Sequence, residues 1–414
     1  MIYFSDSKAA LQGEVHLPYS KSISNRLLIL QAQAMEKLEI KHLSGANDTQ
    51  LLQKLIGLRQ HTDGLLRLDA EDAGTVYRFM TAWLAIQDGQ MSFLDGHARM
   101  YERPVSALVV ALQSLGADIR YTGKPGYPPL QIQGKELTGS RVKIHSDVSS
   151  QFISALCLIA PFLKNGLVLD IHDQQISRSY ISMTLDCLKE LGIMVEESNH
   201  LIKIGPSKIH ETSYTIEADW SSASFFYLMA MLRPGSTLKL LGLQSSSIQG
   251  DAALMNLARH FGVYSSPVED GILIRSEEIP QIENLFLDLS QMPDVAVPLM
   301  LGCAILHPAV KFGGIAHLAF KESHRIHALA KELAKLGIEL IENQGIYSFR
   351  KSVIFPQGIT MEFSSHNDHR MAMSLACLAL IGLKVELDDW QCVRKSFPEF
   401  WNELHELGFD SVYI

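Results

Sequence analysis

The chain has 414 residues, of which 47% are hydrophobic and 20% are charged, and its formal net charge is −9. Because a single hydrophobic core rarely grows beyond about 250 to 300 residues, a chain of this length predicts two domains. The negative charge argues against nucleic-acid binding and against a general attraction to anionic lipids, so any anionic ligand must be bound by local basic groups.

The beginning of the sequence lacks the basic residues and the apolar run of a signal peptide, and no stretch approaches about 20 uninterrupted apolar residues. We therefore expect a cytoplasmic protein without a membrane partner. Four of the five cysteines lie in apolar, helix-like runs without the paired spacing of metal ligands. Cys157, Cys187, Cys303 and Cys377 are accordingly predicted to be inert core thiols.

Six segments along the chain combine a short polar opening with an apolar helix. The openings begin at Lys21, Asp72, Ser149, Ser221, Asp294 and Asp368, and after a first interval of 51 residues the intervals are 77, 72, 73 and 74. This period exceeds the roughly 20 to 50 residues of solenoid repeats, so each copy should be a whole subdomain. Six copies fit two domains of three. The helices are apolar nearly all round, which predicts that they are buried.

A second series runs between these helices, in which an amphipathic helix ends at an apolar residue plus glycine and a β-like run follows. The glycines are Gly116, Gly192, Gly262, Gly337 and Gly408, at intervals of 76, 70, 75 and 71 residues. Gly57 belongs to a weaker relative of the pattern. The regular spacing again predicts repeated subdomains of helices and strands.

The starts of the apolar helices carry residues that commonly act as N-caps, and each one alone is best interpreted in that way. If three such helices run parallel in each domain, however, their N-termini share one face, where free amides and aligned dipoles favour anions. Two facing domains would then enclose an anion-binding cleft.

Basic residues accompany these helix starts and recur in the connecting segments. A cation at a helix N-terminus opposes the helix dipole at a cost of a few tenths to about 1 kcal/mol, which a bound anion would remove. For any single residue, a solvated charge or a salt bridge to a neighbouring glutamate is an equally good explanation. The helix starts contain Lys21, Arg26, Arg78 and Arg370, and the connections contain Arg99, Arg103, Lys321, Arg325, Arg394 and Lys395.

Three further residues admit both a structural and a functional interpretation. Gly74 either forms a tight turn or lets a ligand approach the backbone closely. Asp294, which follows Pro293, either caps a helix or acts as a base in a cationic cleft. Glu322 either pairs with Arg325 or transfers protons.

Metal and nucleotide sites are not predicted. The pairs His324 with His327 and His366 with His369 lack a third and fourth ligand of recognisable spacing. The sequence contains no GxxxxGK(S/T) phosphate loop, and no GxGxxG motif follows a predicted strand. Nucleotide-dependent kinases and dehydrogenases are therefore not supported.

Eight segments together match a known pattern, and through them the chain resembles the 5-enolpyruvylshikimate-3-phosphate synthase family along essentially its whole length. Their order and spacing also fit. The segments are SKSISNR (20–26), DAGT with the following arginine (72–78), RMYERP (99–104), SSQF (149–152), PDVA (293–296), KESHR (321–325), NDHRMAM (367–373) and KSFPEF (395–400).

The resemblance implies an α/β (α+β) fold of two pseudo-threefold domains, each made of three repeated β-α-β-α-β-β subdomains with buried parallel helices. It implies a first domain at residues 21–217 and a second at 1–20 plus 218–414, with the active site in the interdomain cleft. It also implies a monomer that needs neither a metal nor an organic cofactor.

The implied reaction transfers the enolpyruvyl group of phosphoenolpyruvate to the 5-hydroxyl of shikimate 3-phosphate, within chorismate and aromatic amino-acid biosynthesis. The hydroxyl adds to C2 while C3 is protonated, and the resulting tetrahedral intermediate loses phosphate. We assign Asp294 as the base, with Glu322 and Lys21 handling protons at the methyl carbon and the phosphate.

The resemblance also implies which residues contact each substrate. Phosphoenolpyruvate contacts are expected from Lys21, Gly74, Arg99, Gln151, Arg325, Arg370 and Lys395. Shikimate 3-phosphate contacts are expected from Ser22, Arg26, Ser149, Ser150, Gln151, Ser177, Asp294 and Lys321, with Tyr180 as a further wall. Gly74 also predicts sensitivity to glyphosate, because family members with a larger residue there tend to exclude that phosphonate.

The chain departs from the family pattern at four places, which are Tyr19, Asp72, His317 and the pair Ser323-His324. The carboxylate of Asp72 would repel an anionic ligand unless it faces away or pairs with Arg78 or Arg99. Neither Asp72 nor His317 is therefore assigned to the site.

Two alternative functions are weighed against this one. A transferase acting on a UDP-linked amino sugar shares the repeated architecture, but it generally has a loop cysteine in a glycine-rich context that this chain lacks. A catalytically silent anion-binding or scaffold protein could keep the fold, although the retained carboxylates and cations argue against it. Measuring phosphate release from phosphoenolpyruvate with shikimate 3-phosphate and with the UDP-linked amino sugar distinguishes these three functions.

Overall fold

The computed structural model describes residues 1–4, 9–34, 37–59, 64–145, 149–172, 178–198, 200–351 and 358–411. The chain divides into two compact units. The middle unit is Ser20–Ile216, and the terminal unit combines Met1–Tyr19 with Glu217–Ile414. In the part of the chain that is described, no helix combines the length and the apolar character needed to cross a membrane.

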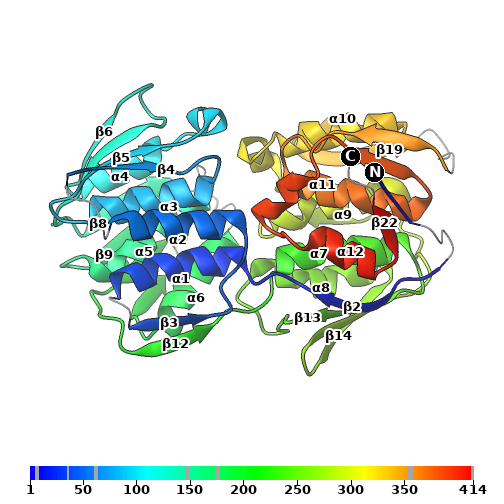
Figure 1. Cartoon of the computed structure of the whole chain (residues 1–414), viewed down its shortest axis with the longest axis horizontal. Helices are drawn as coiled ribbons and strands as arrows, with labels where there is room; N and C mark the ends of the chain where they lie inside the picture. The colour runs from blue at the N-terminus through cyan, green and yellow to red at the C-terminus, as the bar shows by residue number, and fades with distance from the viewer. Residues whose placement is uncertain are drawn as a thin grey trace. The chain divides into compact units, whose positions relative to one another are not determined.

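In its described part the terminal unit contains three four-stranded sheets, each with the elements β-α-β-α-β-β, although two of the copies take one strand, β2 or β1, from the N-terminal segment (Figure 1). The first consists of β2 (Gln12–His16), α7 (Trp220–Leu232), β13 (Thr237–Leu241), α8 (Leu254–Leu257), β14 (Val263–Val268) and β15 (Gly271–Ser276). The second consists of β16 (Phe286–Asp288), α9 (Ala296–Leu306), β17 (Lys311–Gly313), α10 (Arg325–Lys335), β18 (Ile338–Asn343) and β19 (Ile346–Lys351). The third consists of β20 (Thr360–Phe363), α11 (His369–Ala376), β21 (Lys384–Leu387), α12 (Phe400–Glu406), β22 (Phe409–Ser411) and β1 (Ile2–Phe4).

The middle unit repeats this plan. One copy consists of β4 (Leu65–Asp69), α3 (Gly74–Ala85), β5 (Met91–Asp95), α4 (Ser106–Ser114), β6 (Asp118–Tyr121) and β7 (Leu130–Gln133). Another consists of β8 (Arg141–His145), α5 (Ser150–Ile159), β9 (Leu167–His172), α6 (Arg178–Glu190), β10 (Val195–Ser198) and β11 (Leu201–Ile204). The remaining copy consists of β12 (Thr212–Thr215), α1 (Lys21–Gln33), β3 (Leu38–Lys41) and α2 (Asn47–Arg59), and its sheet holds only the parallel pair β12 and β3 among the described residues.

The five four-stranded sheets share one strand order. The first two strands of each copy pair in parallel, as in Leu65↔Met91 between β4 and β5, the fourth strand pairs antiparallel with the second, and the third pairs antiparallel with the fourth. Within the described ranges, eight short 3-10 helices interrupt the copies. They are η1 (Ala98–Glu102), η2 (Ala160–Phe162), η3 (Gly250–Ala253), η4 (Ala258–Phe261), η5 (Pro293–Val295), η6 (Ala316–Phe320), η7 (Cys377–Ile381) and η8 (Gln391–Lys395).

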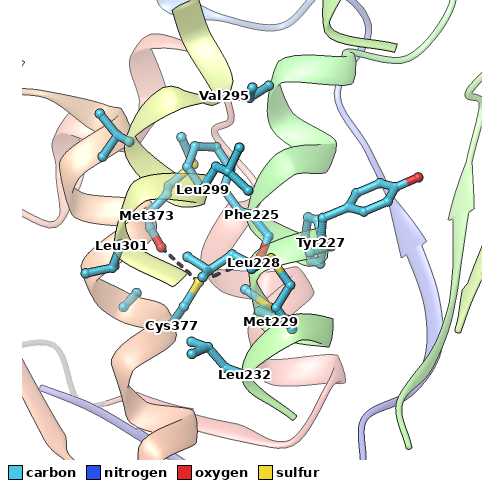
Figure 2. Packing of buried hydrophobic residues seen from close by; sticks show 14 of the residues in the cluster. Phe225, Tyr227, Leu228, Met229, Leu232, Val295, Leu299, Leu301, Met373 and Cys377 are labelled. Carbon is cyan, nitrogen blue, oxygen red and sulfur yellow. Dashed lines mark hydrogen bonds between the residues drawn. The ribbon is translucent and has the colours of Figure 1, made fainter. Parts of the chain in front are cut away.

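The first helix of each copy lies at the centre of its unit, as its apolar sequence predicts. Helices α1, α3 and α5 contact one another in the middle unit, and α7, α9 and α11 do so in the terminal unit (Figure 1). Every residue of α7 is buried. Figure 2 shows Phe225 and Leu228 of α7 packed with Leu299 of α9 and Met373 of α11. Each fully buried side chain of this size contributes about 1.5 to 3 kcal/mol of hydrophobic stabilisation.

The glycines of the second series end helices as predicted. The φ angles of Gly116, Gly192, Gly262, Gly337 and Gly408 are all positive, between 68° and 105°, and a strand follows each one. Only glycine adopts this left-handed conformation without a steric penalty. Gly57 differs, because it lies inside α2, which continues to Arg59.

Candidate active site

The six predicted helix starts lie at or next to the starts of the six central helices. Four of these helices begin with a side-chain cap, since Ser20, Ser149, Asp219 and Asp368 each accept a hydrogen bond from a backbone N–H of the first turn. Helix α3 begins differently. Its N-cap, Ala73, offers no side-chain hydrogen bond, and the first helical residue is Gly74.

A buried arginine organises the charged groups of the terminal unit. The side chain of Arg325, at the start of α10, is 1% exposed. Its Nε lies 2.8 Å from Asp368, its Nη1 lies 2.9 Å from Asp294, and its Nη2 lies 2.7 Å from Glu322. Burial opposes its charge, but the carboxylates of Asp368, Glu322 and Asp294 raise the pKa of Arg325 above its ordinary value. The cation is therefore permanently charged.

Asp294 joins two further cations to this cluster. Its Oδ2 lies 3.0 Å from Nη2 of Arg370, and its Oδ1 lies 3.6 Å from Nζ of Lys321. Nη1 of Arg370 also donates to the backbone carbonyl of Asp294, at 3.3 Å. Five predicted residues are thus brought together from η5, the segment between η6 and α10, and the starts of α10 and α11. They are Asp294, Lys321, Glu322, Arg325 and Arg370.

The cations of this cluster are already paired with carboxylates. For each basic residue the sequence left open either a role in binding an anion or a salt bridge to a neighbouring carboxylate. Arg325 and Arg370 contact carboxylates of the same unit, in line with the salt-bridge alternative for Glu322. An anionic ligand would have to exchange with these carboxylates rather than fill an uncompensated site.

Two carboxylates of this region were not predicted as site residues. Asp368 caps α11 and binds Arg325, and the sequence indicated only its capping role. Asp251 lies in η3, is buried, and accepts a hydrogen bond from Ser221. Burial, reinforced by the charge of Asp294, raises the pKa of Asp251 to about 7. Nothing in the segment around Asp251 distinguished it from an ordinary helix-start carboxylate.

Three further basic residues of the terminal unit, Lys321, His317 and Lys395, lie in partly or fully buried surroundings. Burial lowers the pKa of Lys321, against the attraction of Asp294. Burial and the charge of Lys321 lower the pKa of His317 to about 4, so the imidazole is neutral at neutral pH. Lys395 is half-buried at the end of η8, which packs against α11.

The middle unit gathers polar groups at the start of α3. Gln151, in the first turn of α5, donates from Nε2 to Oγ1 of Thr75 at 2.9 Å, and its Oε1 accepts from Nη1 of Arg78. The guanidinium of Arg78 also lies over the ring of Phe152, 5.1 Å from its centroid. Gly74 and Gln151, which were predicted together from the sequence, are therefore brought to one helix start.

Lys21 and Arg26 both lie on α1 but differ in their contacts. Nζ of Lys21 lies 3.1 Å from Asp48, a buried carboxylate of α2 that the sequence did not single out. Arg26 is buried, and its guanidinium donates to Thr184, to the backbone carbonyls of Ser22 and Tyr180, and to Ser154. Burial lowers the pKa of Arg26. These contacts give Arg26 a structural role in joining α1 to α5 and α6.

Arg99 is partly exposed on η1, where it pairs with Glu102. The carboxylate of Asp72 contacts His97 at 3.8 Å, and Asp72 is an exposed residue. Ser22, Ser149 and Ser150 lie at the starts of α1 and α5. Ser177 lies outside the described residues.

The charged groups of both units are of the kinds that suit oxyanion binding and proton transfer. Arginine and lysine can bind phosphate and carboxylate oxygens, and buried carboxylates can exchange protons with a substrate. Among the described residues, no group of three or more histidine, cysteine, aspartate or glutamate side chains is placed to hold a metal ion.

Comparison with known proteins gives a consistent result. The family model described as EPSP synthase (3-phosphoshikimate 1-carboxyvinyltransferase) matches residues 6–404. The chain is 38% identical to the 3-phosphoshikimate 1-carboxyvinyltransferase of Bacteroides fragilis strain YCH46, over 99% of this chain and 98% of the relative. It is 31% identical to the protein of the same name from Sulfurovum sp. strain NBC37-1, over 96% and 97%.

Solved structures confirm the predicted fold. An EPSP synthase from Acinetobacter baumannii superposes with a TM-score of 0.76 at 21% identity, covering 99% of this chain and 98% of that one. The enolpyruvyl transferase NikO from Streptomyces tendae gives a TM-score of 0.73 at 15% identity, covering 99% and 97%.

Proposed function

The chain belongs to the EPSP synthase family, and we propose that the charged residues described above carry out the family's reaction. The chain transfers the enolpyruvyl group of phosphoenolpyruvate to the 5-hydroxyl of shikimate 3-phosphate and releases phosphate, which is 3-phosphoshikimate 1-carboxyvinyltransferase activity. The reaction belongs to aromatic amino-acid biosynthesis.

One observation supports the assignment of residues most strongly. Asp294, Lys321, Glu322, Arg325 and Arg370 form a single cluster of ion pairs that is largely buried. The cluster combines cations that suit phosphate and carboxylate oxygens with carboxylates that can exchange protons. Enolpyruvyl transfer requires both, because two anionic substrates are bound and protons move at the hydroxyl and at C3.

Asp294 is the proposed base, and its contacts indicate how it becomes active. A carboxylate that is held by three cations is a weak base, because each cation stabilises its charged form. When oxygens of phosphoenolpyruvate take over Arg325 and Arg370, Asp294 loses two of these partners and becomes more basic. It then accepts the proton of the 5-hydroxyl as the hydroxyl oxygen bonds to C2.

The remaining proton transfers are proposed for Glu322 and Lys21. C3 receives a proton as C2 is attacked, which gives the tetrahedral intermediate. In the second step the C2–O bond to phosphate breaks, a proton leaves C3, and the enol double bond forms again. Glu322 contacts Arg325 and would be released by the same exchange that frees Asp294.

The proposed contacts come from both units. For phosphoenolpyruvate they are Lys21, Gly74, Arg99, Gln151, Arg325, Arg370 and Lys395. For shikimate 3-phosphate they are Ser22, Arg26, Ser149, Ser150, Gln151, Ser177, Asp294 and Lys321. We further propose that one pair of substrates is bound by both sets of residues, and that the enzyme acts as a cytoplasmic monomer without a nucleic-acid partner.

Phosphate release in the presence of alternative acceptors tests this function. Purified protein is mixed with phosphoenolpyruvate and either shikimate 3-phosphate or the UDP-linked amino sugar, and the product is identified by its mass. We expect phosphate to be released when the acceptor is shikimate 3-phosphate and not when it is the UDP-linked amino sugar. Release only with the UDP-sugar would overturn the assignment, and no release with either would indicate a silent binding protein. Inhibition by glyphosate, which Gly74 predicts, is measured in the same assay.

A further inference from the structure

The segment between β20 and α11 contains a turn in an unfavourable backbone conformation. His366 and Asn367 both have φ angles of 53°, in the left-handed region that residues other than glycine seldom adopt. Asp368, the N-cap of α11, follows at once, and Arg370 lies in the first turn of that helix. Because the conformation carries a steric cost, contacts around the turn must hold it in place, directly before residues of the charged cluster.

A buried carboxylate of α10 makes such contacts. Glu332 is 0% exposed. Its Oε1 lies 2.8 Å from Nε2 of His366, and its Oε2 accepts a hydrogen bond from the backbone N–H of Ser364 at 3.1 Å. Nζ of Lys335, on the same helix, lies 2.6 Å from Oε2. Both oxygens of Glu332 are therefore engaged, and each has a partner in the turn.

Helix α10 contacts the turn at a second point. Arg325 and Glu332 are seven residues apart on this helix, so they lie on one face of it, roughly 10 Å apart along the axis. At the end of the turn, Asp368 accepts a hydrogen bond from Nε of Arg325 at 2.8 Å. Residues 364–368 therefore run alongside α10 from Glu332 to Arg325, and Glu332 fixes the end that lies farther from the charged cluster.

Further contacts hold the residues that precede His366. Asp388 accepts hydrogen bonds from Oγ of Ser364 at 2.6 Å and from the backbone N–H of Ser365 at 2.7 Å. The backbone N–H of His366 donates to Oγ of Ser364 at 3.2 Å. The side chain of His366 is anchored by Glu332. The contact between Glu332 and His366 thus acts on the first left-handed residue itself.

We propose that Glu332 and His366 are positioning residues for the reaction, whose contact holds the left-handed turn so that Arg370 keeps the orientation in which it meets phosphoenolpyruvate. The inference rests on the proposed function, which takes Arg370 as a phosphoenolpyruvate contact. Neither Glu332 nor His366 needs to touch a substrate. A contact that only stabilised the fold would lower the unfolding temperature when removed, and would leave the binding of phosphoenolpyruvate unchanged.

Steady-state kinetics at saturating shikimate 3-phosphate test the proposal. Glu332→Gln keeps one acceptor oxygen in place of two, and His366→Ala removes the imidazole, so each should raise the KM of phosphoenolpyruvate about fivefold to tenfold, with a smaller change in kcat. His366→Gln keeps an N–H donor of similar reach and should stay within about twofold of wild type. Glu339→Gln, in an exposed ion pair with Arg350 of the same unit, is the matched control and should leave KM unchanged.

A double-mutant cycle tests whether the pair acts through Arg370. Arg370→Ala should itself raise KM, and adding His366→Ala should raise it by less than about twofold more, because the side chain that the turn positions is gone. If the two increases multiply, the pair does not act through Arg370 and the proposal is overturned. It is also overturned if His366→Ala lowers the unfolding temperature but leaves KM unchanged, since the contact then serves stability alone.

Hydrogen exchange of the full-length protein without substrates gives a readout that does not depend on turnover. The backbone amides of residues 364–372 should exchange faster in Glu332→Gln and His366→Ala than in the wild type, whereas His366→Gln should resemble the wild type. Equal exchange in all four proteins would show that the pair does not hold the turn, and would contradict the proposal. If exchange differs but the wild type shows no turnover with shikimate 3-phosphate, the proposed function fails and the role of the pair in holding the turn stands.

Discussion

Asp294 contacts more charged groups than an ordinary helix-start carboxylate. Its two oxygens lie 2.9 Å from Arg325, 3.0 Å from Arg370 and 3.6 Å from Lys321. A helix cap would need none of these cations. The arrangement ties the basicity of Asp294 to the occupancy of the cations, so that substrate binding and proton transfer depend on the same ion pairs.

Asp294→Asn should therefore lower kcat by about a hundredfold to ten-thousandfold, the usual contribution of a general base, while the KM values change much less. Asparagine keeps the shape of the side chain but cannot accept the proton of the hydroxyl. Steady-state kinetics of the variant give both constants. Asp270→Asn, an exposed aspartate of the same unit, is the control and should behave as wild type. Turnover of Asp294→Asn close to the wild-type rate would rule out its role as base.

Asp251 predicts a pH dependence of stability. Its pKa is about 7 in the folded protein and near 3.8 in an unfolded chain, because burial and Asp294 oppose its charge while Ser221 and Arg370 favour it. The unfolded chain therefore releases this proton first as pH rises from about 4, so the contribution of Asp251 to stability falls until about pH 7. Asp219 adds to the opposition.

Asp251→Asn removes this titration. The free energy of unfolding of the variant, relative to wild type, should rise by at least about 1 kcal/mol between about pH 5.5 and about pH 8, since one pKa unit corresponds to about 1.4 kcal/mol. Denaturant titrations at the two pH values measure it. A difference between the two proteins that does not change with pH would contradict the raised pKa.

The sequence indicated the chemistry of single residues better than their partners. Asp294, Glu322 and Arg370 could be predicted because each lies in a distinctive motif next to a helix start. The partner of Lys21 could not, because Asp48 lies on another helix and nothing in its own segment marked it.

At the scale of helices and strands, the hydrophobic pattern was sufficient to predict the repeat. Helices that are apolar all round can only be buried, and helices with a polar face must cover them. The positions of Gly192 and the other helix-ending glycines fixed where each strand begins. The sequence did not show that the described part of one copy of the middle unit holds a two-stranded sheet. In that copy the glycine of the pattern, Gly57, lies inside α2 and so does not mark the start of a strand.

Two glycines of the middle unit provide a matched test of this interpretation. A Cβ would meet nothing within 4 Å at either Gly57 or Gly192, but Gly57 lies inside α2 whereas Gly192 has a φ of 76°. Gly57→Ala should stabilise the protein by about 0.5 to 1 kcal/mol, because alanine loses less backbone entropy in a helix. Gly192→Ala should destabilise it by about 1 to 2 kcal/mol through the left-handed conformation. Equal effects in denaturant titrations would contradict the assignment of the two positions.

At the scale of the whole molecule, the division into two units makes a prediction about folding. The middle unit is one continuous segment, Ser20–Ile216, and its strands pair only with one another among the described residues. A fragment of residues 20–216 should therefore fold cooperatively on its own. It should show no turnover, because Asp294 and Arg325 belong to the terminal unit. Circular dichroism during thermal unfolding tests the first expectation, and a fragment that stays unfolded would contradict it.

Transfer of an enolpyruvyl group by this chain requires the C2–O bond of phosphoenolpyruvate to break rather than the O–P bond. The most direct test uses phosphoenolpyruvate with a heavy oxygen isotope in the bridging position, together with shikimate 3-phosphate and the full-length protein. Mass spectrometry then locates the label. We expect the label to leave in the released phosphate while the acceptor gains the enolpyruvyl group. Label retained in pyruvate, with an unchanged acceptor, would show phosphate hydrolysis and contradict it.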